Sequence, residues 1–243
     1  MSIFGNRLKR VNCKTWDATA EGFVFPEQGD PEFMASELMD RPNLGLAFSG
    51  GGTRSAAATL GQLRGLVHIG LLDKVRYCSC VSGSAFVTIP FTYLPDSWTD
   101  KTYLGPAIPP ENLTIDHLRQ TDRNSCAHTI ANSVLIDDFL RHMVRLAGDE
   151  TFSRMLGDVF LGPFGVDAGR RFFAYDHWSV KVILKHNPHM KTSDFYQVRP
   201  GRPFLISNSL ILRSENPAPL PRRIPFESTP LYVGVRPLFP GAG

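Results

Sequence analysis

A short apolar run, three successive glycines and an amphipathic segment follow one another near residue 44, and this order constrains the fold most. The run Leu44–Phe48 favours a buried strand that ends in Ser-Gly-Gly-Gly-Thr-Arg. The alanine-rich segment Arg54–Leu72 has a broad apolar face, which indicates a helix. A second strand over Val75–Val81 and a helix over Ala85–Leu94 repeat the unit. Such crossovers place strands in parallel, so we expect an α/β fold with a mostly parallel central sheet.

The remaining segments carry weaker signals. Residues 1–42 are punctuated by proline and glycine and predict an irregular lead-in with one short helix near Glu32–Met39. Residues 95–114 predict a loop. Apolar spacing predicts helices at Ser133–Leu146, Thr151–Phe160 and Arg170–Lys185, and strands at Phe204–Leu212 and Leu231–Val235.

The length and charge of the chain narrow its class. A chain of 243 residues is large enough for one sizeable domain. The 26 basic and 23 acidic residues leave a net charge of +3, which is too small to indicate nucleic-acid binding. We therefore expect no nucleic-acid partner.

Four cysteines show no pairing pattern. They are not arranged as C-x-x-C and have no Cys/His ligand spacing, so the sequence indicates neither a zinc site nor a disulfide framework. We expect Cys78 and Cys80 to pack as small apolar side chains, and we expect no metal and no cofactor. The first residues contain no apolar run of signal-peptide length, so a cytoplasmic location is the default expectation.

The glycines Gly50, Gly51 and Gly52 are a candidate anion cradle. Glycines allow positive φ, so several N–H groups can point to one spot at the start of the next helix, where the helix dipole favours negative charge. The anion would be a phosphate or the oxyanion of an acyl-transfer intermediate, and Arg54 could pair with a phosphate. A tight turn without a ligand is the plain alternative. A dinucleotide motif lacks its third glycine, because Ser55 stands there, and a P-loop lacks its Gly-Lys-Ser/Thr.

Ser82 follows the second strand, in the position of a nucleophile elbow. Its neighbours are small, as such a turn requires, although the outer glycines of G-x-S-x-G are replaced. The alternative role for Ser82 is an N-cap of the following helix. If the two strands are parallel neighbours, their carboxyl ends bring the Gly50–Gly52 amides beside the Ser82 hydroxyl.

These motifs resemble those of patatin-like phospholipases, and especially the cytosolic phospholipase A branch. The resemblance rests on Gly50–Arg54 and on Val81–Ser84, each after an apolar strand. The segments Arg202–Asn208 and Pro225–Gly234 are similar to late segments of that branch. The resemblance to this family implies a three-layer α/β/α patatin-like fold in which residues 43–243 form the catalytic domain.

The function that the resemblance implies is serine-dependent hydrolysis of lipid acyl esters. Ser82 would be the nucleophile, Gly51 and Gly52 would offer oxyanion amides, Gly50 would shape the turn, and Arg54 would hold a lipid phosphate. The substrate would be a phospholipid or a lysophospholipid. Peripheral contact with a membrane surface is a further expectation, because arginines are frequent near the C-terminus.

The catalytic acid is the missing part of this motif set. The family has its aspartate in Asp-Gly-Gly or Asp-Gly-Ala, and neither tripeptide occurs here. We expect that the chain lacks the C-terminal part of the catalytic domain, and the alternative is an inactive lipid- or anion-binding domain. Internal substitutes are Asp167, in Asp-Ala-Gly, and the pair Asp176 and His177, which could complete a Ser-His-Asp triad.

Overall fold

The computed structural model describes residues 11–33, 35–132, 151–166, 171–212 and 223–235. Its strands are β1 (Gly45–Ala47), β2 (Tyr77–Val81), β3 (Phe172–Ala174), β4 (Phe195–Gln197), β5 (Phe204–Leu212), β6 (Arg223–Ser228) and β7 (Val233–Val235). Its helices are α1 (Pro26–Gly29), α2 (Ser36–Met39), α3 (Gly52–His68), α4 (Ala85–Thr92), α5 (Asp100–Leu104), α6 (Ile115–Arg119), α7 (Cys126–Asn132), α9 (Thr151–Leu156) and α10 (His177–His186).

The central sheet has the strand order β1-β2-β5-β6-β7. The pairs β1–β2 and β2–β5 are parallel, and β6 and β7 extend the sheet in the antiparallel sense. A second, two-stranded sheet pairs β3 with β4 in parallel. The expected α/β class with parallel strands at its centre is confirmed. The parallel pair β1–β2 matters most for the site, because β1 ends with Ala47 opposite Ser79, two residues before the end of β2 at Val81.

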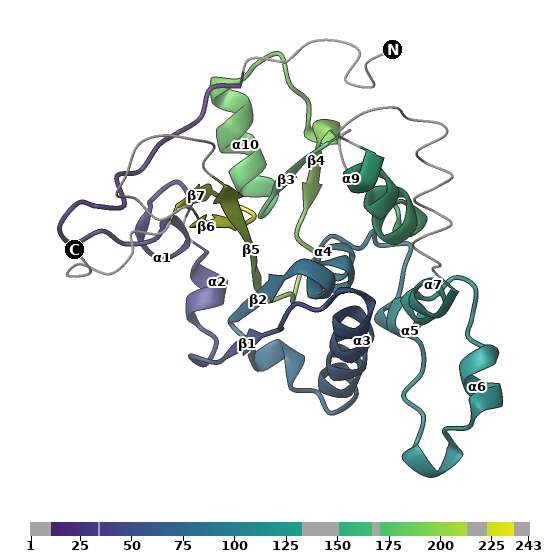
Figure 1. The fold of residues 1–243 in the computed structure, drawn as a ribbon. Helices are drawn as coiled ribbons and strands as arrows, with labels where there is room; N and C mark the ends of the chain where they lie inside the picture. Colours follow the sequence, from purple (N-terminus) through teal and green to yellow (C-terminus); the bar gives the residue numbers. More distant parts are fainter. Residues whose placement is uncertain (1–10, 34, 133–150, 167–170, 213–222, 236–243) are drawn as a thin grey trace.

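Alternation along the strands gives the sheet two covered faces. On one face Cys78, Cys80 and Leu205 pack against α3 and α4. On the other face Tyr77 and Phe204 pack in the cluster that contains α2. Figure 1 shows α3 and α2 on opposite sides of β1 and β2. Successive side chains point to opposite faces of a strand, so this separation follows directly from the sequence of β2.

Helix α3 is built by an apolar stripe at helical spacing. Ala56, Leu60 and Leu63 are buried against the sheet, whereas Gly61 is exposed on the opposite side. Burial of each leucine stabilises the fold by roughly 1.5–3 kcal/mol relative to an exposed side chain. The helix ends at His68, and Gly70 follows with a φ of 67°.

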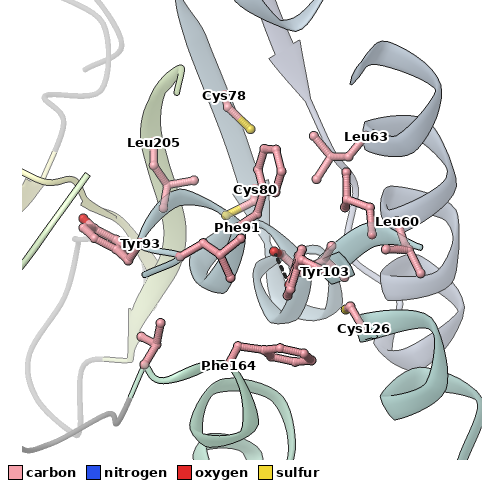
Figure 2. Close-up of a cluster of buried hydrophobic side chains, with 14 of the residues drawn as sticks. Leu60, Leu63, Cys78, Cys80, Phe91, Tyr93, Tyr103, Cys126, Phe164 and Leu205 are labelled. Atoms are coloured by element: carbon pink, nitrogen blue, oxygen red, sulfur yellow. Dashed lines mark hydrogen bonds between the residues drawn. The ribbon is translucent and has the colours of Figure 1, made fainter. Parts of the chain in front are cut away.

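The main core lies between α3, β2 and α4, and residues of α5 and α7 complete it (Figure 2). Tyr103 is completely buried there and donates a hydrogen bond to the carbonyl oxygen of Val87 at 2.9 Å. The thiols of Cys78, Cys80 and Cys126 also lie in this core, while Cys13 is exposed. The expected packing of Cys78 and Cys80 as small apolar side chains is confirmed.

An ion pair ties the start of β5 to α5. Arg202 is buried, and its Nη1 lies 2.8 Å from Oδ2 of Asp100, which is 102 positions away. The same side chain donates from Nε to the Phe91 carbonyl oxygen at 2.9 Å and stacks on the Phe91 ring at 3.7 Å. The guanidinium thereby joins the start of β5 to α4 and α5, both about a hundred positions earlier in the chain.

Several sequence expectations need correction. The expected loop at 95–114 contains α5, because Thr99 caps a short helix by accepting a hydrogen bond from the Thr102 N–H. The expected helix over Arg170–Lys185 begins only at His177, and β3 occupies Phe172–Ala174. Strands β4 and β6 were not expected. The expected helix at Ser133–Leu146 lies outside the described residues.

None of the described helices combines the length and the apolar composition that crossing a bilayer requires.

Candidate active site

The glycine turn and the Ser82 turn lie against each other at the carboxyl ends of β1 and β2. A Cβ atom on Gly50 would lie 3.1 Å from Cβ and 3.7 Å from Oγ of Ser82. The N–H of Phe48 donates to the Ser79 carbonyl oxygen at 2.9 Å, which continues the ladder to the edge of both turns. The expected juxtaposition of these two turns is therefore present.

Ser82 occupies a backbone conformation that L-residues rarely adopt. Its φ is 56°, and it is the only non-glycine residue with a positive φ in the described ranges. The left-handed conformation costs an L-residue roughly 1–2 kcal/mol. The side chain is nevertheless exposed, at the point where β2 passes into a 3₁₀ turn and α4. A strained, exposed serine between a strand and a helix is the geometry of a nucleophile elbow.

Gly83 is buried where the two turns touch. A Cβ atom on Gly83 would lie 2.0 Å from the carbonyl oxygen of Gly52. No side chain fits at that distance, so glycine is required after Ser82. The packing of these two glycines fixes the distance between the serine and the start of α3.

Ser84 closes the turn from the inside. Its Oγ accepts a hydrogen bond from the Val81 N–H at 2.9 Å. The hydroxyl also lies 2.9 Å from the Val81 carbonyl oxygen and 3.3 Å from that of Phe48. Ser84 is completely buried, so these contacts hold the backbone on both sides of Ser82.

Asn208 is a supporting residue that the sequence analysis did not assign to the site. It lies opposite Val81 in the β2–β5 register. Its Nδ2 donates to Ser79 Oγ at 2.8 Å and to the Cys80 carbonyl oxygen at 3.1 Å. The amide thus holds the last residues of β2 in place. A polar Asn after the apolar run of β5 was the available signal.

The glycine turn leads directly into the longest described helix. Gly51 and Gly52 have φ values of 144° and 64°, and α3 begins at Gly52. The first N–H groups of a helix have no intrahelical acceptor and carry partial positive charge. Arg54 is exposed in the first turn of α3. The start of α3, with its unpaired amide groups and Arg54 in its first turn, therefore packs against the turn that carries Ser82.

The thiols behind the elbow are unsuited to nucleophilic chemistry. Burial raises the pKa of the Cys78 thiol, and the neighbouring Cys80 adds to this effect. Burial likewise raises the pKa of Cys80. Both thiols remain protonated at neutral pH, and the thiolate is the reactive form of cysteine. Of these side chains, the Ser82 hydroxyl is the one that is exposed at this end of β2.

The candidate acids and bases do not assemble around Ser82 in the described part of the chain. Asp176 caps α10, because its carboxylate accepts a hydrogen bond from the Ser179 N–H at 2.7 Å. His177 is exposed at the start of the same helix. Within the described ranges, Ser82 Oγ forms no hydrogen bond with either residue. The expected alternative triad is thus not formed, and Asp167 lies outside the described residues.

A wide groove in the described part of the molecule lies away from Ser82. It has a volume of about 990 Å³ and is lined by the N-terminal segment, α10 and the β6–β7 hairpin. Aromatic side chains such as Trp16, Phe172 and Tyr232 form much of its wall. Neither of the two turns contributes to it, so the candidate site is the exposed junction of the turns.

Comparison with known proteins supports the resemblance that the motifs suggested. No protein-family model matches the chain. The chain is 45% identical over 65 residues to cytosolic phospholipase A2 zeta of Mus musculus, a match that covers 27% of this chain and 8% of the relative. It is 40% identical over 74 residues to cytosolic phospholipase A2 zeta of Homo sapiens, covering 29% of this chain and 9% of the relative. The matched region thus spans less than a tenth of these curated relatives.

Solved structures of human GIVD cytosolic phospholipase A2 are also similar to the chain. One covers 86% of this chain and 24% of its own, with 19% identity and a TM-score of 0.40. Another, in complex with methyl gamma-linolenyl fluorophosphonate inhibitor and terbium chloride, covers 86% and 25%, with 18% identity and a TM-score of 0.37. The sequence similarity to the curated relatives confirms the predicted resemblance to the cytosolic phospholipase A branch.

Proposed function

We propose that this chain supplies the serine nucleophile and the glycine cradle of a lipid acyl hydrolase. The observation that carries the proposal is the exposed Ser82, with its φ of 56°, packed against the glycine turn that starts α3. Similarity to cytosolic phospholipases A2 supports a phospholipid or a lysophospholipid as the substrate. The site lies within the proposed catalytic domain of residues 43–243.

In the proposed reaction, Ser82 Oγ attacks the carbonyl carbon of an acyl ester. The new C–O bond forms as the Ser82 proton passes to a general base, which then gives it to the leaving alcohol, and the carbonyl oxygen becomes an oxyanion. In this proposal the N–H groups of Gly51 and Gly52, at the start of α3, stabilise that charge. A single oxyanion donor is typically worth about 2.7–4 kcal/mol of the barrier. The alcohol leaves with a proton, and water then hydrolyses the acyl-enzyme.

Arg54 has a separate proposed role in substrate binding. It is exposed one turn from Gly51, at the same end of α3 as the cradle. A guanidinium at this place would pair with the lipid phosphate, because planar guanidinium groups bind phosphate oxygens in bidentate fashion. Contact with a membrane surface would follow from binding that phosphate in a lipid layer.

A fluorophosphonate probe tests the nucleophile directly. The probe forms a covalent adduct with an activated serine, so intact mass should increase by one adduct. Ser82→Ala should remove the adduct, whereas Ser193→Ala, at another exposed serine, should retain it. An adduct that persists in Ser82→Ala would contradict the assignment. Circular dichroism of both variants shows that the comparison is made on folded protein.

A second candidate function is a non-catalytic lipid-binding domain. The observation that favours it is that Ser82 Oγ has no hydrogen-bonded base in the described part of the chain. In that case the folded protein would give no fluorophosphonate adduct. It would still bind vesicles that contain an anionic phospholipid, and Arg54→Gln would weaken that binding. An adduct on Ser82 would decide against this alternative.

A further inference from the structure

A second group of cationic side chains lines a pocket at the far end of α3. Arg64 and His68 are one helical turn apart on α3, and Lys101 comes from α5. Helix α5 lies beside α3 (Figure 1). Together with residues 104–107 these side chains enclose a pocket of about 360 Å³. Residues four apart share a helix face, so the positions of Arg64 and His68 bring both to this pocket.

Arg64 is half-buried and has no carboxylate partner within the described ranges. Its Nε donates to the Leu104 carbonyl oxygen at 2.9 Å, and its Nη2 also donates to that oxygen. Burial lowers the pKa of the guanidinium, which means that the charged form is poorly solvated there. A half-buried cation whose acceptor among the described residues is a neutral carbonyl is better satisfied when an anion joins it.

Asp100 also lines the pocket, but its charge is already paired. Its carboxylate binds the guanidinium of Arg202 at 2.8 Å and lies 3.8 Å from Nη1 of Arg199. The negative charge of Asp100 is therefore neutralised by Arg202 and Arg199. Arg64 and Lys101 leave the pocket with an excess of positive charge.

The backbone around the pocket is shaped for the guanidinium. Gly105 has a φ of 78°, and a Cβ atom there would lie 3.1 Å from Arg64 Nη2. A larger residue would displace the Arg64 side chain and adopt a strained conformation. The glycine thus keeps the guanidinium against Leu104 while the next residues, Pro106 and Ala107, form the pocket wall.

We propose that this pocket binds a phosphate group. Phosphate carries up to two negative charges and several acceptor oxygens, which suits a guanidinium, an ammonium and an imidazole around one space. The pocket begins twelve residues along α3 from Gly52, or roughly 18 Å at 1.5 Å per residue. It is therefore separate from the proposed catalytic turn, and it stands whether or not Ser82 is a nucleophile.

Calorimetric titration of the full chain with inorganic phosphate at constant ionic strength tests the site. The double variant with His68→Gln and Lys101→Gln removes two exposed side chains, so the fold should be retained. Affinity for phosphate should fall at least about tenfold, because charge-assisted hydrogen bonds are lost. Lys181→Gln, an exposed lysine on α10, is the matched control and should bind as the wild type does.

The source of the phosphate is decided by vesicles. Phosphatidylcholine vesicles that contain phosphatidic acid present a phosphomonoester at a surface. Sedimentation of the wild type, but not of the double variant, with these vesicles identifies a lipid headgroup as the ligand. Binding of free phosphate without vesicle binding identifies a soluble phosphoester. Equal phosphate affinity of the wild type and the double variant, or no binding at about 10 mM phosphate, would overturn the proposal.

Discussion

At the scale of single residues, the junction of the two turns leaves almost no freedom of substitution. Ser82 carries the strained φ, and Gly83 carries the closest approach between the turns. Strain of this kind persists only where the surrounding contacts enforce it. Here Ser84 and Asn208 supply those contacts on either side of β2. Stability and reactivity should therefore respond differently to changes at neighbouring positions.

Gly83→Ala should destabilise the protein strongly. The new methyl group would lie 2.0 Å from the backbone oxygen of Gly52, and a backbone atom cannot move aside as a flexible side chain can. We expect a loss of about 3 kcal/mol or more in the free energy of unfolding, at the upper end of overpacking costs. Urea denaturation measures it, and a loss under about 1 kcal/mol would show that the turns can separate.

Substitutions of Ser82 itself should separate strain from chemistry. Glycine adopts a φ of 56° without the cost that alanine pays there. We expect Ser82→Gly to be more stable than Ser82→Ala by about 1 kcal/mol, while both lose fluorophosphonate labelling. Thermal and urea denaturation of the two variants provide the comparison. Equal stabilities would mean that the backbone relaxes at this position.

Site residues could be predicted from the sequence where the residues next to them in the chain define the turn. Ser82 and Gly50–Gly52 could be placed together because two strand ends and their turns are visible in the sequence. Asn208 could not be assigned to the site, since its role depends on the pairing of β5 with β2, across 127 positions of chain. The roles of Ser82 and the glycines in catalysis stay predictions.

At the scale of elements, α3 links the two sites that bind anions in our proposals, one at each end of this helix. Its apolar stripe decides its orientation, and its exposed side carries glycine at Gly61, where nothing lies within 4 Å of a Cβ position. A substitution at Gly61 therefore changes stability through helix propensity alone, because the new side chain meets no packed neighbour.

Gly61→Ala should stabilise the protein. Alanine is favoured over glycine by about 1 kcal/mol in a helix interior, and the new methyl group meets no atom. The midpoint of urea denaturation should rise with an unchanged slope. This variant is also the matched control for Gly83→Ala, because both add one methyl group. A decrease in stability would mean that the exposed face of α3 has a partner in solution.

The element boundaries show what the sequence could and could not determine. The helix expected from Arg54 begins two residues earlier, since Gly52 adopts a positive φ and still enters the helix. β6 escaped notice because Pro225 interrupts its pattern, although the strand pairs with β5 on one side and β7 on the other. Proline has no N–H to donate to the sheet, so it argued against a strand in the sequence. The strand forms because the other residues of β6 pair with β5 and β7.

At the scale of the whole molecule, the Asp100–Arg202 pair holds distant segments together. Burial raises the pKa of the Asp100 carboxyl, but the hydrogen bonds and charge of Arg202, with Arg199 nearby, outweigh burial and hold the pKa below 3.8. A lowered pKa in the folded state stabilises the protein above the unfolded pKa. This contribution is lost as the pH falls through the folded pKa.

Asp100→Asn should destabilise the protein at pH 7. It should also make the free energy of unfolding depend less on pH in the acid range. The variant leaves the buried Arg202 guanidinium without its carboxylate, at a cost of about 3 kcal/mol, the lower end for buried pairs because Asp100 is 27% exposed. Between roughly pH 4 and pH 2 the wild type should lose stability more steeply than the variant. Urea denaturation across this range measures both slopes. Parallel curves would mean that Asp100 has the same pKa when unfolded.

Because one cysteine is exposed and three are buried, the number of reactive thiols reports whether the protein is folded or unfolded. Cys13 is exposed, whereas Cys78, Cys80 and Cys126 are buried, and burial raises the pKa of Cys126 to about 12. A maleimide at neutral pH should therefore add once to the native protein and four times after denaturation. Intact mass distinguishes these species, and Cys13→Ser should abolish the native adduct. Because the three protected thiols share one core, they should become reactive together, so the mass spectrum records cooperative opening without any optical probe.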